Sequence, residues 1–332
     1  MGIWSSMVRD NQFQPQDVPR FEAKLFFEGD RRRRQYEQFG VLLFLATVIA
    51  TAGIIANSTA TVIGAMIVAP LMTPIMATTA ALTMGQVGRA VRSLALVGFG
   101  VLFVIGLSGL LGWLYQGVVE FRVNPQITGR VSPTVVDLIA ALASGAAGAF
   151  CMSREDISDS LAGVAIAISL VPPLCVVGLS MQAGYSEEAH GAMLLFATNF
   201  LSILLAGGAV LAILGLNKAA NARIIGSARR NAYMAIGLAT LMVSVPLVAT
   251  GRQATANFLG QQQSSAFVEG WLEGSSYANE GVNYLGNTVR VTISGAGDPP
   301  SFDNLVQGLR SQLRRPVVVS LKVVPAEEFV SQ

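Results

Sequence analysis

The chain has 332 residues, of which 52% are hydrophobic and only 13% are charged. This charged fraction is about half of the roughly 25% found in soluble domains, so an ordinary soluble globular protein is excluded. The formal net charge of +2 is too small to indicate a nucleic-acid partner, and no His/Cys/Asp/Glu cluster has metal-ligand spacing, so we expect no enzyme, no metal and no cofactor.

Residues 1–38 are polar and lack the apolar core of a cleavable signal peptide. Apolar and charged side chains interleave over 20–27, and four consecutive arginines follow at 31–34. This pattern predicts a short amphipathic helix on the membrane surface that ends in a basic anchor. We interpret the arginines as a topology determinant of a cytoplasmic segment, with binding of anionic membrane lipid as the alternative.

Uncharged apolar runs of about 18 or more residues are typical of transmembrane helices, and the next part of the chain contains several. No Asp, Glu, Lys or Arg occurs between Glu37 and Arg89. We expect an α-helical polytopic membrane protein with about seven membrane segments, two of them interrupted, in a transmembrane domain over 39–250. The uninterrupted helices are expected over about 39–56, 93–115, 134–152, 191–215 and 232–250.

Proline interrupts two further apolar segments near their middles. Residues 57–82 are broken at Pro70 and Pro74, and residues 160–181 are broken at Pro172-Pro173. Proline lacks the amide hydrogen and clashes with the carbonyl four residues earlier. In lipid, broken backbone is tolerated only where protein or a water-lined cavity receives the freed polar groups. The two breaks are therefore candidate functional sites.

The distribution of arginine and lysine indicates the orientation. If both interrupted segments cross the membrane, most basic loops face the cytoplasm, the N-terminus is cytoplasmic and the C-terminus is extracytoplasmic. If both are re-entrant hairpins, the basic residues fit the positive-inside rule only slightly less well, and both termini stay on the same sides of the membrane. Length favours crossing, because about 25 helical residues cover about 37 Å, more than the roughly 30 Å membrane core.

The two interrupted segments occupy corresponding places, about one hundred residues apart. Each follows an apolar helix rich in small residues and precedes another full helix, which predicts inverted three-helix repeats. Paired interrupted helices in inverted halves are typical of transporters that bind solute at the bilayer midplane. The alternative is that two proline-containing helices arise by chance in a polytopic protein.

Residues 251–332 lose the long apolar runs and predict a small extracytoplasmic α+β or βαβ domain. We expect helices over 252–273 and 301–313, a half-buried strand over 287–294 with alternating apolar residues, and a second strand over 316–324. A domain of this size is barely large enough to be stable alone. We therefore expect it to associate with the membrane part or with copies of itself in a homo-oligomer.

The candidate binding residues are neutral polar side chains and prolines near the breaks. Hydroxyls, amides and freed carbonyls of this kind can bind an ion or a small polar solute. The alternative for each polar side chain is an interhelical hydrogen bond, worth about 0.6 kcal/mol on average. The set is Asn57, Ser58, Pro70, Thr73, Pro74, Ser169, Pro172, Pro173 and Asn199.

Asn57-Ser58 and the run VIGAMIVAPLMTPI over 62–75 resemble the bacterial and archaeal membrane family catalogued as domain of unknown function 389. The segment 169–174 and the helix that contains Asn199 are similar to later parts of that family, and the likeness covers about 37–250. This resemblance implies a multi-pass protein of the prokaryotic inner membrane. It implies no particular activity.

Two functional hypotheses follow from these patterns. The first is a transporter or channel for an ion or small polar solute, with its site between the two proline breaks. The second is a non-transport membrane scaffold or sensor, in which the breaks only shape the helix bundle and residues 251–332 bind a partner.

Overall fold

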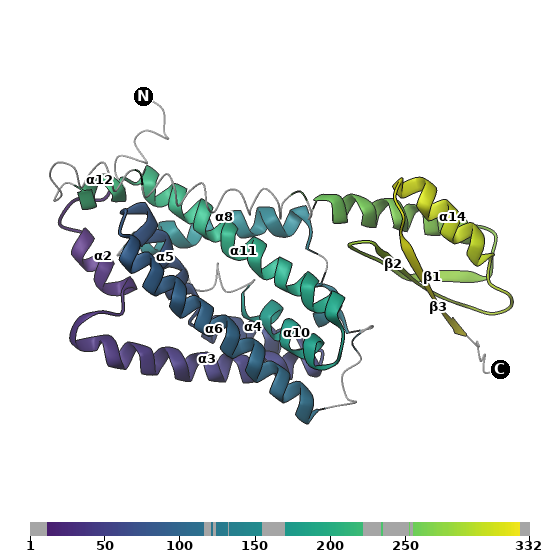
Figure 1. The fold of residues 1–332 in the computed structure, drawn as a ribbon, viewed down its shortest axis with the longest axis horizontal. Coiled ribbons are helices and arrows are strands. Elements are labelled where there is room, and N and C mark those ends of the chain that lie inside the picture. The colour runs from purple at the N-terminus through teal and green to yellow at the C-terminus, as the bar shows by residue number, and fades with distance from the viewer. Residues whose placement is uncertain are drawn as a thin grey trace, which may run out of the picture. The chain divides into compact units, whose positions relative to one another are not determined.

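The computed structural model describes residues 12–115, 121, 124–131, 133–154, 170–221, 234, 252 and 255–325. These residues form two compact units, a bundle of long apolar helices and a C-terminal unit made mainly of residues from 252 onward. Figure 1 shows the helices and strands of each unit. The expected membrane helix 232–250, apart from Met234, and the part of the interrupted segment 160–181 before Leu170 lie outside the described residues.

Ten α-helices of the bundle have defined bounds among the described residues. They are α2 (Val18–Leu25), α3 (Arg32–Ile55), α4 (Thr59–Val68), α5 (Met72–Thr83), α6 (Val87–Leu114), α7 (Pro125–Thr128), α8 (Val135–Met152), α10 (Val171–Gln182), α11 (Ser186–Ile213) and α12 (Leu216–Asn221). Four described helices are long and apolar enough to cross a membrane. They are the helical stretch Val18–Ile55, which contains α3, and the helices α6, α8 and α11. The pair α4 and α5, bent by 50°, adds a fifth if it is one span.

The expected helices over 39–56, 93–115, 134–152 and 191–215 are confirmed, but three of them begin five to seven residues earlier than their apolar runs. Their first turns contain polar residues that are good helix formers or favour a helix N-terminus. For example, Arg33 pairs with Glu37 at 2.8 Å, and Glu187 and Glu188 occupy the first turn of α11. Hydropathy marks the apolar part of a helix, and the helix itself extends beyond it.

The amphipathic helix α2 is confirmed, but its apolar face does not lie on lipid. Val18, Phe21 and Leu25 are buried within the apolar core of the bundle, with exposed fractions of 5% or less. The expected surface helix is therefore a packed part of the bundle, because the bundle offers its apolar face a complementary surface of protein.

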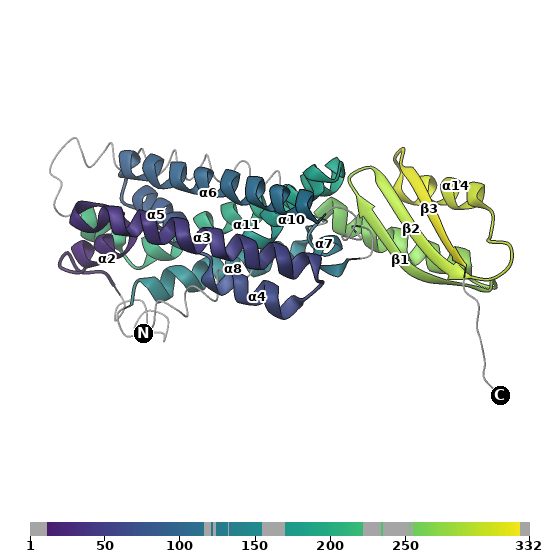
Figure 2. The ribbon, with the colours of Figure 1, turned by 90° about the horizontal axis from the view of Figure 1, so that it is seen from below.

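Hydrogen bonds identify the two ends of the bent pair. Where α4 begins, Asn124 Nδ2 donates to the carbonyl of Ile54 at 2.7 Å, close to the last residue of α3. Just after α5 ends, Gln86 Nε2 donates to Glu22 Oε1 of α2 at 3.2 Å, beside the start of α3. We call these the Asn57 end and the α2 end of the bundle; both are visible in Figure 2. The two ends of the bent pair thus lie toward opposite ends of the bundle.

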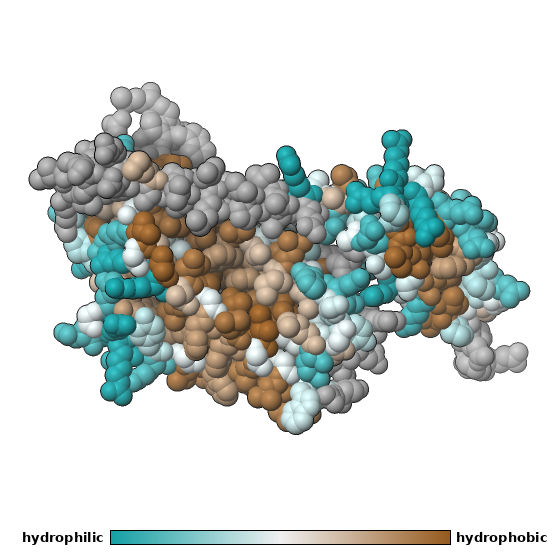
Figure 3. Space-filling model, viewed as in Figure 1, coloured by the Kyte–Doolittle hydropathy of each residue, from teal (hydrophilic) through white to brown (hydrophobic). Residues whose placement is uncertain are grey.

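Apolar side chains cover the outer faces of the long helices. On the visible face of the bundle, hydrophobic residues fill the middle and hydrophilic residues gather toward the α2 end (Figure 3). On α6, Phe99, Leu102 and Trp113 are each more than half exposed. Large exposed apolar patches of this kind are typical of a membrane-facing surface.

The C-terminal unit is a three-stranded sheet with helices on one face. A helix over 255–272 is followed by β1 (Tyr277–Leu285), β2 (Thr288–Gly295), α14 (Phe302–Leu313) and β3 (Val318–Pro325). β1 and β2 pair antiparallel, and β2 and β3 pair parallel through α14, so the expected βαβ unit is confirmed. β1 was not predicted, because its sequence YANEGVNYL lacks a regular alternation of apolar and polar residues.

Candidate functional site

The bend between α4 and α5 lies at Ala69–Leu71. Ala69 has extended backbone angles (φ −62°, ψ 126°), and α5 begins two residues after Pro70. Pro74, which is buried in the first turn of α5, brings no amide hydrogen to that turn. Its carbonyl accepts a hydrogen bond from Thr78 Oγ1 at 2.8 Å, the i−4 bond that threonine commonly forms within a helix. The interrupted segment therefore keeps a local break inside a packed bundle.

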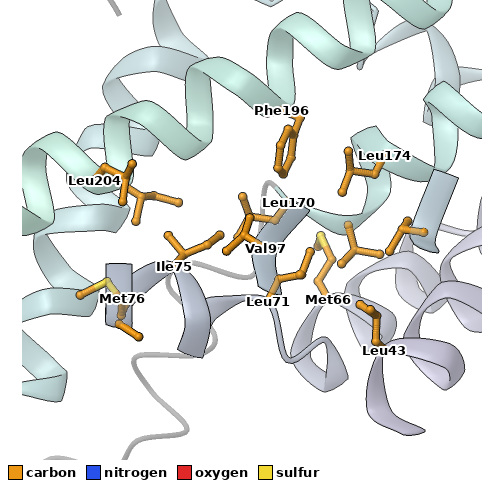
Figure 4. Packing of buried hydrophobic residues seen from close by; sticks show 14 of the residues in the cluster. Leu43, Met66, Leu71, Ile75, Met76, Val97, Leu170, Leu174, Phe196 and Leu204 are labelled. Atoms are coloured by element: carbon orange, nitrogen blue, oxygen red, sulfur yellow. The ribbon is translucent and has the colours of Figure 1, made fainter. Parts of the chain in front are cut away.

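The second break lies at the start of α10, whose first turn contains Pro172 and Pro173. Every residue from Leu170 to Ser180 is buried. Figure 4 shows Leu71 of the first break together with Leu170 and Leu174 of the second in one apolar cluster. Leu71 beside the first break and Leu170 and Leu174 at the second thus belong to the same apolar core of the bundle.

An apolar layer closes the bundle at the level of the first break. A Cβ atom at Gly100 of α6 would lie 2.7 Å from Leu71 Cδ2, 3.5 Å from Phe39 Cζ and 3.6 Å from Leu43 Cδ2. We call Phe39, Leu43 and Leu71, which meet at Gly100, the Leu71 layer. All three side chains are buried, with exposed fractions of 3%, 0% and 1%.

A pocket of about 130 Å³ lies between the α2 end and this layer. Its walls come from the connection between α2 and α3, from α3 itself and from α6, and its lining includes Pro74 and Ala77 of α5. Pro74 follows Leu71 by three residues, so the pocket ends about one helical turn from the Leu71 layer. We call it the basic pocket, because its charged lining residues are Glu28, Arg32, Arg89 and Arg92.

Arg89 is the most strongly bonded residue of the basic pocket. Its Nη1 lies 3.0 Å from Glu22 Oε1, and its Nη2 and Nε bind both carboxylate oxygens of Glu28 at 2.7 and 3.1 Å. Its guanidinium lies 4.6 Å from the centre of the Phe26 ring. Bidentate and stacked contacts suit arginine and not lysine, so Arg89 is a specific anchor between α6 and the N-terminal segment.

Arg32 and Arg92 contribute positive charge to the same pocket. Among the described residues, Arg32 contacts the Tyr36 ring at 5.7 Å, and neither Arg32 nor Arg92 forms an ion pair with a described carboxylate. Glu28 and Glu22 are already bound by Arg89. A partly enclosed cavity lined by uncompensated charge of one sign concentrates ions of the opposite sign, so the pocket favours anions.

Replacing Arg89 with alanine is expected to loosen the N-terminal segment from the bundle. Hydrogen bonds to charged groups contribute about 1.5–3 kcal/mol, and the partial exposure of these side chains reduces the expected loss to about 1–2 kcal/mol. Trypsin is therefore expected to cleave after Lys24 faster in Arg89→Ala than in the wild type. Arg33→Ala, which removes an exposed i,i+4 pair, is the control. Equal cleavage of the two variants would contradict the anchoring role.

The remaining predicted residues are not all near the breaks. Asn57 adopts the left-handed conformation (φ 50°) in the turn between α3 and α4, and Ser58 caps α4 by accepting from the Thr61 amide at 3.4 Å. Both lie at the Asn57 end, about 15 Å from the bend, because ten residues of α4 separate them from it. Asn199 is 2% exposed within α11, and Ser169 lies outside the described residues.

Loop residues that the sequence did not single out close the Asn57 end. Gln126 Nε2 donates to Thr59 Oγ1 at 2.7 Å, and Asn124 is bound to Ile54 as described above. Arg130 Nη1 donates to the Gln126 backbone carbonyl and to its Oε1, and burial lowers the pKa of Arg130. The bonds from Asn124 to Ile54 and from Gln126 to Thr59 join positions about seventy residues apart, and no local pattern in the sequence predicts them.

Comparison with known proteins covers the part of the chain that contains both breaks. Residues 66–205 match a family described as a domain of unknown function (DUF389). The uncharacterized protein MJ0678 of Methanocaldococcus jannaschii is 34% identical over 177 residues, which are 53% of this chain and 54% of that protein. The chain therefore aligns with about half the length of this curated relative. No solved structure matches.

Proposed function

We propose that this multi-pass membrane protein, which carries a domain of unknown function (DUF389) over residues 66–205 and is a distant homologue of MJ0678, transports an ion or small polar solute past its broken helices. The basic pocket is the observation that carries the proposal, because it reaches Pro74 from the α2 end. Interrupted membrane helices beside a cavity are the usual place for solute binding in transporters. The charge of the pocket favours an anion.

Transport requires that the Leu71 layer opens. The described arrangement is closed, since Phe39, Leu43 and Leu71 fill the space around Gly100. Pro70 and Pro74 remove amide hydrogens at the bend, and kinks and hinges commonly form where such hydrogen bonds are missing. A change in the angle between α4 and α5 would withdraw Leu71 from Gly100 and extend the pocket toward the second break. Pro70, Thr73 and Pro74 would then line the path, with Pro172, Pro173 and Asn199 beyond it.

The location of the arginines supports a cytoplasmic α2 end. Arg32 lines the same pocket at this end as Arg89 and Arg92, although more than fifty residues separate it from them in the sequence. Basic residues accumulate on the cytoplasmic side of membrane proteins. We therefore propose a prokaryotic inner-membrane protein with its N-terminus in the cytoplasm and residues 251–332 outside. Asn57 and Ser58 would lie at the outer end of the path.

Replacing Leu71 with alanine tests the proposal, because it removes the side chain that closes the pocket. We expect anion flux through reconstituted liposomes to rise several-fold above that of the wild type, measured with a halide-sensitive dye or by nitrate-driven swelling. Leu102→Ala is the control, since Leu102 is 73% exposed on the outer face of α6. Both variants are first compared by size-exclusion chromatography, because burial of leucine contributes about 2–5 kcal/mol to folding.

A second substitution distinguishes the role of the basic pocket in anion entry from the role of the Leu71 layer in closing the path. Arg92→Gln removes one uncompensated charge from the basic pocket, and we expect it to lower anion flux in the Leu71→Ala background. If neither the wild type nor folded Leu71→Ala carries anions or small polar solutes above protein-free liposomes, the transport proposal is wrong.

One observation favours the scaffold or sensor as the second candidate. β3 is an edge strand of the sheet, and Val318, Val323 and Val324 on it are 63%, 38% and 36% exposed. Exposed apolar edge strands are templates for pairing with another chain, including a second copy in a homo-oligomer. Capture of a stoichiometric partner through residues 251–332, with flux unchanged by Asn199→Ala, would favour this candidate.

A further inference from the structure

The C-terminal unit contains a second cavity, which is unrelated to the transport proposal. It is a groove of about 720 Å³ between the helix over 255–272 and the connection from α14 to β3. Among the residues that the structure describes, the charged ones that line it are Arg252, Arg314 and Arg315, and none is an aspartate or glutamate. Thr255, Gln263, Ser311 and Gln312 add polar groups. We call this cavity the arginine groove.

The wall beneath the arginines is rigid. Tyr284 is 1% exposed, and a Cβ atom at Gly260 would lie 2.6 Å from its ring, so the helix and β1 are in close contact. Gln261 strengthens this contact, because its Oε1 accepts from the Tyr284 amide at 2.6 Å and its Nε2 donates to the Val282 carbonyl at 2.5 Å. The groove therefore keeps its shape without a ligand.

None of the three arginine charges is neutralised by a described carboxylate. Arg315 Nη1 donates to the hydroxyl of Tyr284 at 3.2 Å, and this neutral partner orients the guanidinium without cancelling its charge. Arg314 occupies the left-handed cap of α14 (φ 51°), a position that glycine fills in many helices. Among the described residues, the guanidinium groups of Arg252 and Arg314 form no hydrogen bond or ion pair. The groove thus holds three positive charges ready for a ligand.

We propose that the arginine groove binds an organic phosphate. Guanidinium groups bind phosphate oxygens through paired hydrogen bonds, and several arginines with no carboxylate between them select for anions. The volume lies within the roughly 300–1,000 Å³ of small-molecule sites, so the ligand is larger than inorganic phosphate. The phosphate can come from a lipid headgroup or from a soluble phosphate ester. Arg252 follows the apolar run 232–250 by two residues, which places a lipid source within reach of the chain.

The test uses the full chain in nanodiscs and the double variant Arg252→Gln, Arg314→Gln. Both substitutions keep hydrogen-bonding side chains at exposed positions and remove two charges from the groove. Arg290→Gln, on the opposite face of β2, is the control for loss of charge from the same unit. Hydrogen exchange over 255–263 and 311–315 reports occupancy, and calorimetry reports affinity.

Two arms distinguish the sources of phosphate. In phosphatidylcholine nanodiscs, binding of glycerol 3-phosphate that weakens at least tenfold in the double variant supports a soluble ligand. Protection that appears only when phosphatidylglycerol is added to the nanodisc, and is lost in the double variant, supports a lipid headgroup. Absence of both responses overturns the proposal, and so does an equal loss in Arg290→Gln, because that result would indicate nonspecific attraction by net charge.

Discussion

Substitution of Gly178 by alanine is expected to prevent the bundle from folding. A Cβ atom at Gly178 in α10 would overlap Ser108 Oγ and the Ile105 carbonyl oxygen, and it would lie 2.9 Å from the Gly109 amide nitrogen. Two of these three neighbours are backbone atoms of α6, so no rotamer change can relieve the contact. α10 is buried from Val171 to Ser180. An outward shift of this helix would therefore open gaps against its other neighbours.

The expected loss exceeds the roughly 1–3 kcal/mol that is typical of overpacking, because the clash is with backbone. Thermal stability in detergent and the monodisperse fraction after size-exclusion chromatography are the measurements. Gly106→Ala on α6, where a Cβ atom meets nothing within 4 Å, is the matched control. Adding Ser108→Ala to Gly178→Ala removes only the hydroxyl and is not expected to restore folding. If Gly178→Ala were as stable as the wild type, the backbones of α6 and α10 would not approach each other closely at Gly178.

Hydropathy and proline positions predicted much of the bundle, since both report directly on local energetics. The apolar runs identified α3, α6, α8 and α11, and the prolines identified the bend after Val68 and the start of α10. The additional polar turns at the helix starts were missed, because helix propensity and hydrophobicity are different properties. The number of seven membrane segments and the inverted repeat depend on residues outside the described ranges, so they stay predictions.

The candidate site was less predictable than the fold, because its parts are joined by long-range contacts. The site was expected between the two breaks, and Leu71 and Leu170 belong to the apolar core that extends through the whole bundle. The basic pocket was not expected, although Glu22, Glu28 and Arg89 were all visible in the sequence as charges near membrane helices. Their pairing spans more than sixty residues and depends on α5 returning beside α2. Asn57 was predicted to be a binding residue because its side chain is polar. In the structure it lies in a turn and adopts the left-handed backbone conformation.

Replacing Val291 with aspartate is expected to unfold the C-terminal unit and leave the bundle intact. Val291 is 0% exposed in the central strand β2, between Val282 of β1 and Leu321 of β3. An uncompensated buried charge costs about 3–5 kcal/mol, which matches the roughly 3–5 kcal/mol that a core of this size supplies. The buried apolar residues of the bundle form a separate cluster, so their packing does not depend on this strand.

Thr292→Asp provides a closely matched control for this experiment. Thr292 is the next residue of β2, points to the opposite, half-exposed face and pairs with Lys322 across the sheet, so a carboxylate there gains a partner. Limited proteolysis is expected to degrade residues after 252 in Val291→Asp and to spare them in Thr292→Asp.

The same pair of variants separates the two functional hypotheses, because the basic pocket and the Leu71 layer lie wholly within the bundle. If the protein transports a solute through the bundle, Val291→Asp keeps its flux and loses binding at the arginine groove. If the protein acts as a scaffold or sensor, Val291→Asp loses partner capture, and neither variant shows flux above protein-free liposomes. Protease resistance of Val291→Asp equal to that of Thr292→Asp would contradict the assignment of Val291 to the core of the sheet.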